Sequence, residues 1–143
     1  LQAIQPNDWE LWCLGTGDVK PVEHPKIKHF GFVQPAAMID FIKDTGVFVL
    51  LSHAEPWGVV IHEFAAAGFP IICSDEVGAR RTFVENNLNG YIYASGNVEE
   101  LKSAMTRIIC SSEEKLNGMS QESVSKAKQI TPESWAKQLI SLL

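Results

Sequence analysis

Two glutamates, Glu55 and Glu63, are separated by seven residues within the segment 52–70. An ionised carboxylate only accepts hydrogen bonds, so sugar hydroxyls, which donate them, are suitable partners. The segment predicts a helix that begins near Gly58, and the start of a helix offers free N–H groups and partial positive charge to an anion. Glu55 precedes this point, and Glu63 lies about one and a half turns beyond it. A ligand with a sugar, a diphosphate and a ribose in a row, a nucleotide sugar, fits this order.

Each glutamate taken alone also has a purely structural explanation. Glu55 would favour the helix dipole, and Glu63 would belong to a solvated stripe with His62. The pair is harder to explain in this way, because Pro56-Trp57-Gly58 stands between the acids and an alanine-rich run ending in Gly68 and Pro70 follows them. We therefore favour a ligand site.

Short apolar strands are expected to alternate with amphipathic helices along the chain. This alternation predicts an α/β fold, a Rossmann-like open parallel sheet with helices on both faces, in a single domain of residues 1–143. Ligands of such sheets bind beyond the carboxyl ends of the strands, in the loops expected at 15–20, 32–35, 52–58 and 74–80 and near Asn89. The expected strands are 10–14, 26–33, 47–51, 71–73 and 91–93, and the expected helices are 36–45, 58–67, a short one between 77 and 90, 97–110, 111–128 and 131–143.

The composition limits the class of protein. The 143 residues are 45% hydrophobic and 20% charged, with a net charge of −5, which argues against a nucleic-acid partner bound through a basic surface. The three cysteines are far apart, which predicts neither a disulfide framework nor a zinc site and suits a reducing compartment. With no signal peptide and no apolar run long enough to span a bilayer, we expect a cytoplasmic protein.

Two known binding motifs are present only in part. Gly15-Thr16-Gly17 follows an expected strand, but a dinucleotide-binding loop needs a third glycine where Lys20 stands. A tight turn at the edge of a site is the preferred interpretation. His62-Glu63 would need a second histidine where Ala66 stands, so no zinc site is predicted.

The segment "EPWGVVIHEFAAAGFPIICSDEVG" resembles the "E-P-x-G…E-A-x-A-x-G-x-P-V" block of retaining GT-B-fold glycosyltransferases, the large Glu-x7-Glu family called glycosyl transferases group 1. The stretches "LWCLGTGD", "HFGFV", "VFVLLS", "NNLNGYIY" and "NVEELKSAM" follow the family's order and spacing. The resemblance covers roughly residues 10–109. It corresponds to the carboxyl-terminal, donor-binding half of such an enzyme.

This resemblance implies roles for individual residues. Glu55 would hold hydroxyls of the transferred hexose and position the anomeric carbon, as the catalytic residue, and Glu63 would hold the ribose. No metal or other cofactor is implied, because protein charges and the helix dipole face the diphosphate of a UDP- or GDP-sugar. Transfer would retain the anomeric configuration through an oxocarbenium-like state, with the leaving phosphate taking the acceptor proton. The implied donor-binding residues are Gly15, Gly17, Phe32, Val33, Glu55, Trp57, Gly58, Val59, Val60 and Glu63.

Two departures from the family pattern lead to further expectations. The Arg and Lys that usually hold the diphosphate would precede Leu1, and Lys20, Arg80 and Arg81 are candidates for partial compensation. The acceptor-binding amino-terminal half is also missing. We therefore expect a fragment of a longer two-domain enzyme that makes polysaccharide or modifies a glycan or lipid, inactive by itself and peripherally associated with a membrane through the missing half. A nucleotide-sugar epimerase of the same fold and a non-catalytic scaffold domain remain as alternatives.

Overall fold

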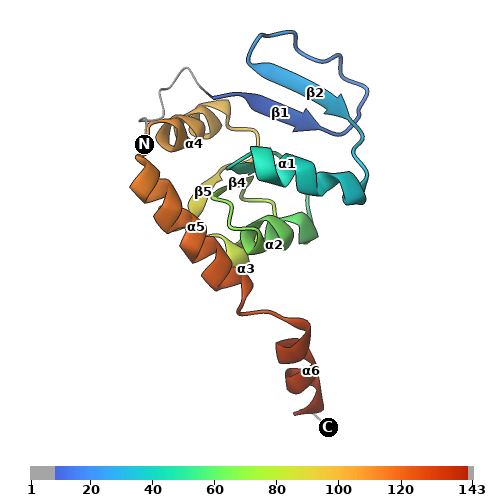
Figure 1. The fold of residues 1–143 in the computed structure, drawn as a ribbon, viewed down its shortest axis with the longest axis vertical. Helices are drawn as coiled ribbons and strands as arrows, with labels where there is room; N and C mark the ends of the chain where they lie inside the picture. Colours follow the sequence, from blue (N-terminus) through green and yellow to red (C-terminus); the bar gives the residue numbers. More distant parts are fainter. Residues whose placement is uncertain (1–8, 142–143) are drawn as a thin grey trace. The chain divides into compact units, whose positions relative to one another are not determined.

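The computed structural model describes residues 9–141. The chain forms two compact units that divide between Gly46 and Val47. Both units are built from parallel strands and helices, which confirms the α/β class predicted from the sequence (Figure 1). Whether the whole chain acts as one domain stays a prediction.

The first unit holds a two-stranded parallel sheet and a helical segment. Its elements are β1 (Leu11–Leu14), β2 (Ile27–Gly31), a short 3-10 helix η2 (Pro35–Ala37) and α1 (Met38–Asp44). Three aromatic rings hold the unit together: Trp12 lies 5.1 Å from Phe30 and 6.0 Å from Phe41, and the last two are 4.9 Å apart, centroid to centroid. Phe41, which helical spacing places on one apolar face with Met38 and Ile42, therefore packs α1 on the sheet.

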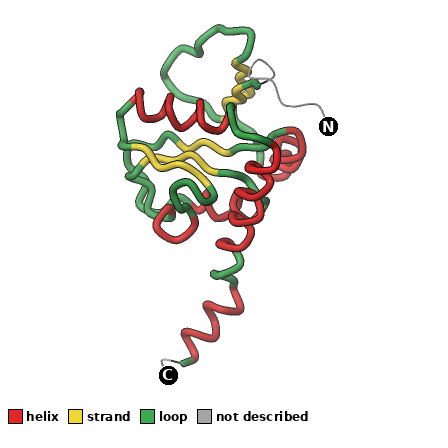
Figure 2. Tube along the Cα trace, turned by 90° about the vertical axis from the view of Figure 1, so that its left-hand side faces the viewer, coloured by secondary structure: helices red, strands yellow, loops and turns green. Residues whose placement is uncertain are grey.

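Within residues 47–141, the second unit holds the parallel sheet β3-β4-β5 and five helices. Figure 2 shows the strands with helices around them. Its strands confirm the apolar runs read as strands in the sequence, and helix α2 confirms the helix expected to begin near Gly58. The short helix α3 and the longer helices after it also match the predicted segments within a few residues. The bounds are β3 (Phe48–Leu50), α2 (Val59–Ala66), β4 (Ile71–Ser74), α3 (Arg80–Phe83), β5 (Gly90–Tyr93), α4 (Val98–Ile109), α5 (Glu113–Ala127) and α6 (Pro132–Ile140).

Strand β4 forms the centre of the second unit and is buried along its whole length. One of its faces, with Ile71 and Cys73, packs against Ile61 of α2 and Phe83 of α3. Successive side chains of a strand point to opposite faces, so the buried Ile72 lies on the other side of the sheet. Burial on both faces explains the apolar run of residues 71–73 in this strand.

A buried polar network connects α5 to the turn before β5. The fully buried Asn89 accepts a hydrogen bond at Oδ1 from the Glu85 N–H (2.7 Å). Its Nδ2 donates to Phe83 O (2.8 Å) and to Ser123 Oγ (3.1 Å), and Ser123 Oγ donates to Phe69 O (2.7 Å). Every polar atom of the Asn89 side chain thus has a partner, which is the condition for burying an amide without a large cost.

The order Thr131-Pro132-Glu133 predicts a cap, a first-turn proline and a first-turn acid, and helix α6 begins in this way. The Thr131 hydroxyl accepts the Ser134 N–H (3.1 Å) and Ser134 Oγ accepts the Thr131 N–H (2.9 Å), which forms a capping box with Pro132 in the first turn. None of its residues is buried, and Trp135 and Leu139, which helical spacing places on one stripe, are exposed. Leu142, also placed on that stripe, lies outside the described residues. No helix of residues 9–141 is long and apolar enough to cross a membrane.

Candidate functional site

Two loops of the second unit lie side by side at the carboxyl ends of β3 and β4. The Glu55 N–H donates to Glu76 O (3.3 Å), and the Gly78 N–H donates back to Glu55 O (2.9 Å). The Ala79 N–H donates to Trp57 O (2.7 Å). These bonds extend the pairing of the two parallel strands into the loops, so the segment around Glu55 is held in a fixed conformation.

Gly78 permits this close approach of the two loops. A Cβ atom added there would lie 2.0 Å from the carbonyl oxygen of Pro56. No side chain fits at that distance, so the juxtaposition of the loops requires glycine at this position.

Gly58 ends the first of these loops and caps α2. Its backbone is left-handed (φ 83°, ψ 65°), and the Ile61 N–H donates to its carbonyl oxygen (3.0 Å) as the first hydrogen bond of the helix. The N–H groups of Val59 and Val60 precede this first helical bond, so the helix itself provides no acceptor for them. These two backbone donors belong to the set predicted to face a diphosphate.

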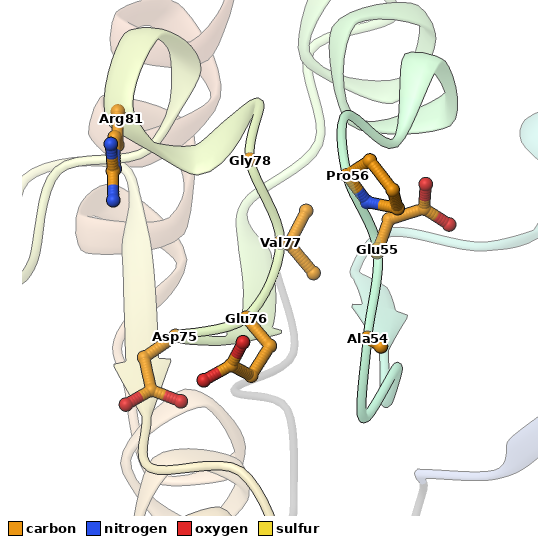
Figure 3. Close-up of a pocket in the computed structure, with 8 residues that line it drawn as sticks. All are labelled: Ala54, Glu55, Pro56, Asp75, Glu76, Val77, Gly78 and Arg81. Atoms are coloured by element: carbon orange, nitrogen blue, oxygen red, sulfur yellow. The ribbon is translucent and has the colours of Figure 1, made fainter.

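A cavity of about 350 Å³ lies between the two loops (Figure 3). The carboxylates of Asp75 and Glu76 stand at one end of it, and Arg81 of α3 stands apart from them. Glu55 lines the cavity, but its carboxylate points away from the other two acids. The acids are therefore separate hydrogen-bond acceptors rather than one converging cluster. The residues that line the cavity are Ala54, Glu55, Pro56, Asp75, Glu76, Val77, Gly78 and Arg81.

Glu63 lies on the exposed side of α2, while Glu55 in the preceding loop is half-buried. The neighbouring His62 fixes the helix on its other side. Its ring stacks on Phe83 with centroids 4.3 Å apart, and its Nε2 makes a 3.1 Å hydrogen bond with Ala127 O. This packing keeps His62 in a structural role and leaves Glu63 open to solvent.

The predicted site residues fall into two groups. The structure places Glu55, Trp57, Gly58, Val59 and Val60 in one continuous loop and helix start, with Glu63 further along the same helix. The other four belong to the first unit, at and just after the ends of β1 and β2. There the Gly15 N–H donates to Gly31 O (2.7 Å) with a left-handed backbone (φ 121°), and Phe32 is exposed. The donor-binding roles of Gly15, Gly17, Phe32 and Val33 stay predictions.

Asp75 and Glu76 were not singled out by the sequence as site residues. The loop that carries them was expected at the site, and Arg81 was named only as a candidate for the diphosphate. The signal available was their position directly after the apolar strand β4. Their side chains line the same cavity as Glu55 because the two loops pair, which local sequence does not reveal.

No group of three histidine, cysteine, aspartate or glutamate side chains that could hold a metal ion is found among residues 9–141. The thiol of Cys73 is buried, and burial raises its pKa to about 12 against a smaller opposing effect of Arg80. A thiol of this kind is a poor nucleophile and a poor metal ligand at neutral pH.

Comparison with known proteins agrees with the fold. Residues 24–126, well over half of the chain, match the family model described as glycosyl transferases group 1. A subunit of Streptococcus agalactiae named UDP-N-acetylglucosamine–peptide N-acetylglucosaminyltransferase GtfA is 34% identical over 70 residues, which are 47% of this chain and 14% of that protein.

Solved structures of GT-B glycosyltransferases share the fold. Sucrose-phosphate synthase from Thermosynechococcus elongatus superposes with a TM-score of 0.70 at 22% identity, over 82% of this chain and 29% of that chain. Anabaena HepE in complex with UDP-glucose gives a TM-score of 0.63 at 24% identity, over 82% of this chain and 33% of that chain. The chain thus spans at most about a third of these three proteins. It belongs to the family of glycosyl transferases group 1.

Proposed function

We propose that this chain is the donor-binding part of a retaining hexosyltransferase. The enzyme would move a hexose from a UDP- or GDP-sugar to a glycan or lipid acceptor. The observation that carries the proposal is the left-handed Gly58 cap, which leaves the Val59 and Val60 N–H groups without a helical acceptor between the two carboxylates of Glu55 and Glu63.

Each end of this arrangement suits one part of a nucleotide sugar. Glu55, half-buried and held by the neighbouring loop, would accept hydrogen bonds from the hexose and position its anomeric carbon. Glu63, on the exposed side of α2, would accept from the ribose hydroxyls. HepE is described in complex with UDP-glucose, so UDP-glucose is the first donor to test.

The cavity carries more negative than positive charge. Asp75, Glu76 and Glu55 line it together with the single cation Arg81. A diphosphate needs additional positive charge, which we propose comes from a part of the enzyme outside this chain. The same part would hold the acceptor, so that the chain by itself binds a donor weakly and does not turn over. We further propose that transfer is metal-independent, with the phosphate leaving group as proton acceptor, in a cytoplasmic enzyme that acts at or near a membrane.

Donor binding can be tested by NMR on the chain itself. Titration with UDP-glucose, and in parallel with a GDP-hexose, should shift the amides of Gly58–Glu63 more than those of α5. Charge-assisted hydrogen bonds contribute about 1.5–3 kcal/mol each, so Glu63→Gln should weaken binding about tenfold or more. Glu99→Gln, which changes an exposed acid on α4 in the same way, serves as the control. Unchanged amides near Gly58 with both donors, while the full-length enzyme binds one of them, would refute the site assignment.

The chemistry requires the full-length enzyme. Glu55→Gln should strongly lower the rate at which the donor is converted into glycoside. The free energy of unfolding of the enzyme should change much less. Product analysis with and without an acceptor separates the proposal from an epimerase, which would convert the donor sugar with no acceptor present. A scaffold domain would bind neither donor. Retention is checked from the anomeric configuration of the product by NMR.

A further inference from the structure

Ser95, just after β5, contacts the loops that follow both other strands of the sheet. Its backbone N–H donates to Asp75 Oδ1 (2.8 Å), and its hydroxyl forms a 3.1 Å hydrogen bond with Nδ1 of His53. Asp75 is itself fixed, because its N–H donates to Tyr93 O (2.9 Å) and its carbonyl oxygen accepts from Nε of Arg80 (2.7 Å). The hydroxyl of Ser95 is therefore presented to His53 from an ordered support.

The loop that carries Glu55 is held at two places. Its later part is held by the backbone bonds between Glu55 and the loop of Glu76 and Gly78. Its earlier part is held through side chains, by Ser74 Oγ donating to Ser52 O and by the bond between His53 and Ser95. His53 lies two residues before Glu55, with only Ala54 between them.

We propose that His53 is a positioning residue for donor binding. Through Ser95 it fixes the backbone from which Glu55 projects, so the loop after β5 takes part in the site although it does not line the cavity. The proposal rests on the donor-binding role of Glu55 proposed above. Its physical basis is that a carboxylate holds a sugar in one orientation only if its own backbone is restricted beforehand.

The test is a set of variants in the full-length enzyme, with UDP-glucose as the probe and affinity measured by calorimetry. A hydrogen bond of this kind corresponds to about a three- to tenfold effect, so His53→Ala and Ser95→Ala should each weaken binding by that factor. The double variant should be no worse than either single one, because both remove the same bond. His53→Asn should keep most of the affinity, since its amide reaches the position of Nδ1, whereas His53→Gln should not. Ser111→Ala, which removes a hydroxyl bonded to Arg107 O on α4, is the control and should change nothing.

Introducing His53→Ala into the Glu55→Gln variant separates a positioning role from a general loss of structure. If His53 acts through Glu55, His53→Ala should have no further effect on affinity once Glu55→Gln is present. A three- to tenfold loss that persists in the Glu55→Gln background would overturn the proposal, and so would an unchanged affinity for His53→Ala in an enzyme where Glu55→Gln alone weakens binding. If Glu55→Gln itself leaves the affinity for UDP-glucose and for a GDP-hexose unchanged, the donor-binding function fails as well.

Discussion

Replacement of Gly58 by alanine tests the local structure on which the proposed site depends. The backbone of Gly58 is left-handed at φ 83°, a conformation that costs an L-residue with a Cβ about 1–2 kcal/mol. The added Cβ would also meet Glu55 Cγ and Val77 Cγ1, each at 3.0 Å. The Glu55 side chain is half-exposed and can yield, but Val77 is buried and cannot move freely.

The two effects together give an expected loss of about 2–4 kcal/mol in the free energy of unfolding. Urea unfolding followed by circular dichroism at 222 nm measures this, because most helical residues belong to the second unit. Donor binding should weaken too, since relief of the contact with Cγ displaces Glu55.

Two other glycines provide matched controls. Gly96 is also left-handed, at φ 79°, but an added Cβ meets nothing within 4 Å, so Gly96→Ala should cost only about 1–2 kcal/mol. Gly118 lies within α5 with open space around it, and alanine there should stabilise the protein by about 0.5–1 kcal/mol. If Gly58→Ala costs no more than Gly96→Ala, the crowding argument is wrong. If it behaves like Gly118→Ala, the left-handed cap itself is wrong.

Two further predictions concern the core of the second unit. Asn89→Ala leaves the buried Phe83 carbonyl and the part-buried Glu85 N–H without their side-chain partner, so we expect a loss of about 2–4 kcal/mol in the free energy of unfolding, measured in urea. A loss below about 1 kcal/mol would mean that water or a rearranged turn replaces the amide. For Cys73, the folded pKa of about 12 lies above that of an unfolded thiol, about 8.5, so the unfolded state ionises first and stability falls as pH rises from about 9 towards 12. Cys73→Ala should reduce this loss of stability, by up to about 4 kcal/mol near pH 12. An equally steep loss of stability in the variant would show that other groups cause it.

Much of the fold follows from local sequence. The unbroken apolar runs at residues 47–51 and 71–73 predict strands, and β3 and β4 lie there. Strand β4 is buried along its whole length, whereas β3, whose run predicts a strand covered on both faces, is only half-buried. Asn97 and Thr131 predict helix starts, and both side chains accept a backbone N–H of the first turn. These features are predictable because apolar runs and helix caps involve residues within one short segment.

The sequence by itself also determined the order of the candidate site: an acid, a glycine at the start of a helix, and a second acid within it. Only the tertiary structure decided which residues from other segments lie next to these acids. Parallel pairing brings Asp75 and Glu76 to the same cavity as Glu55, and the bond between His53 and Ser95 joins residues 42 positions apart. Periodicity and capping describe neighbours along the chain, whereas these contacts depend on the register of the strands and on the backbone approach that Gly78 permits.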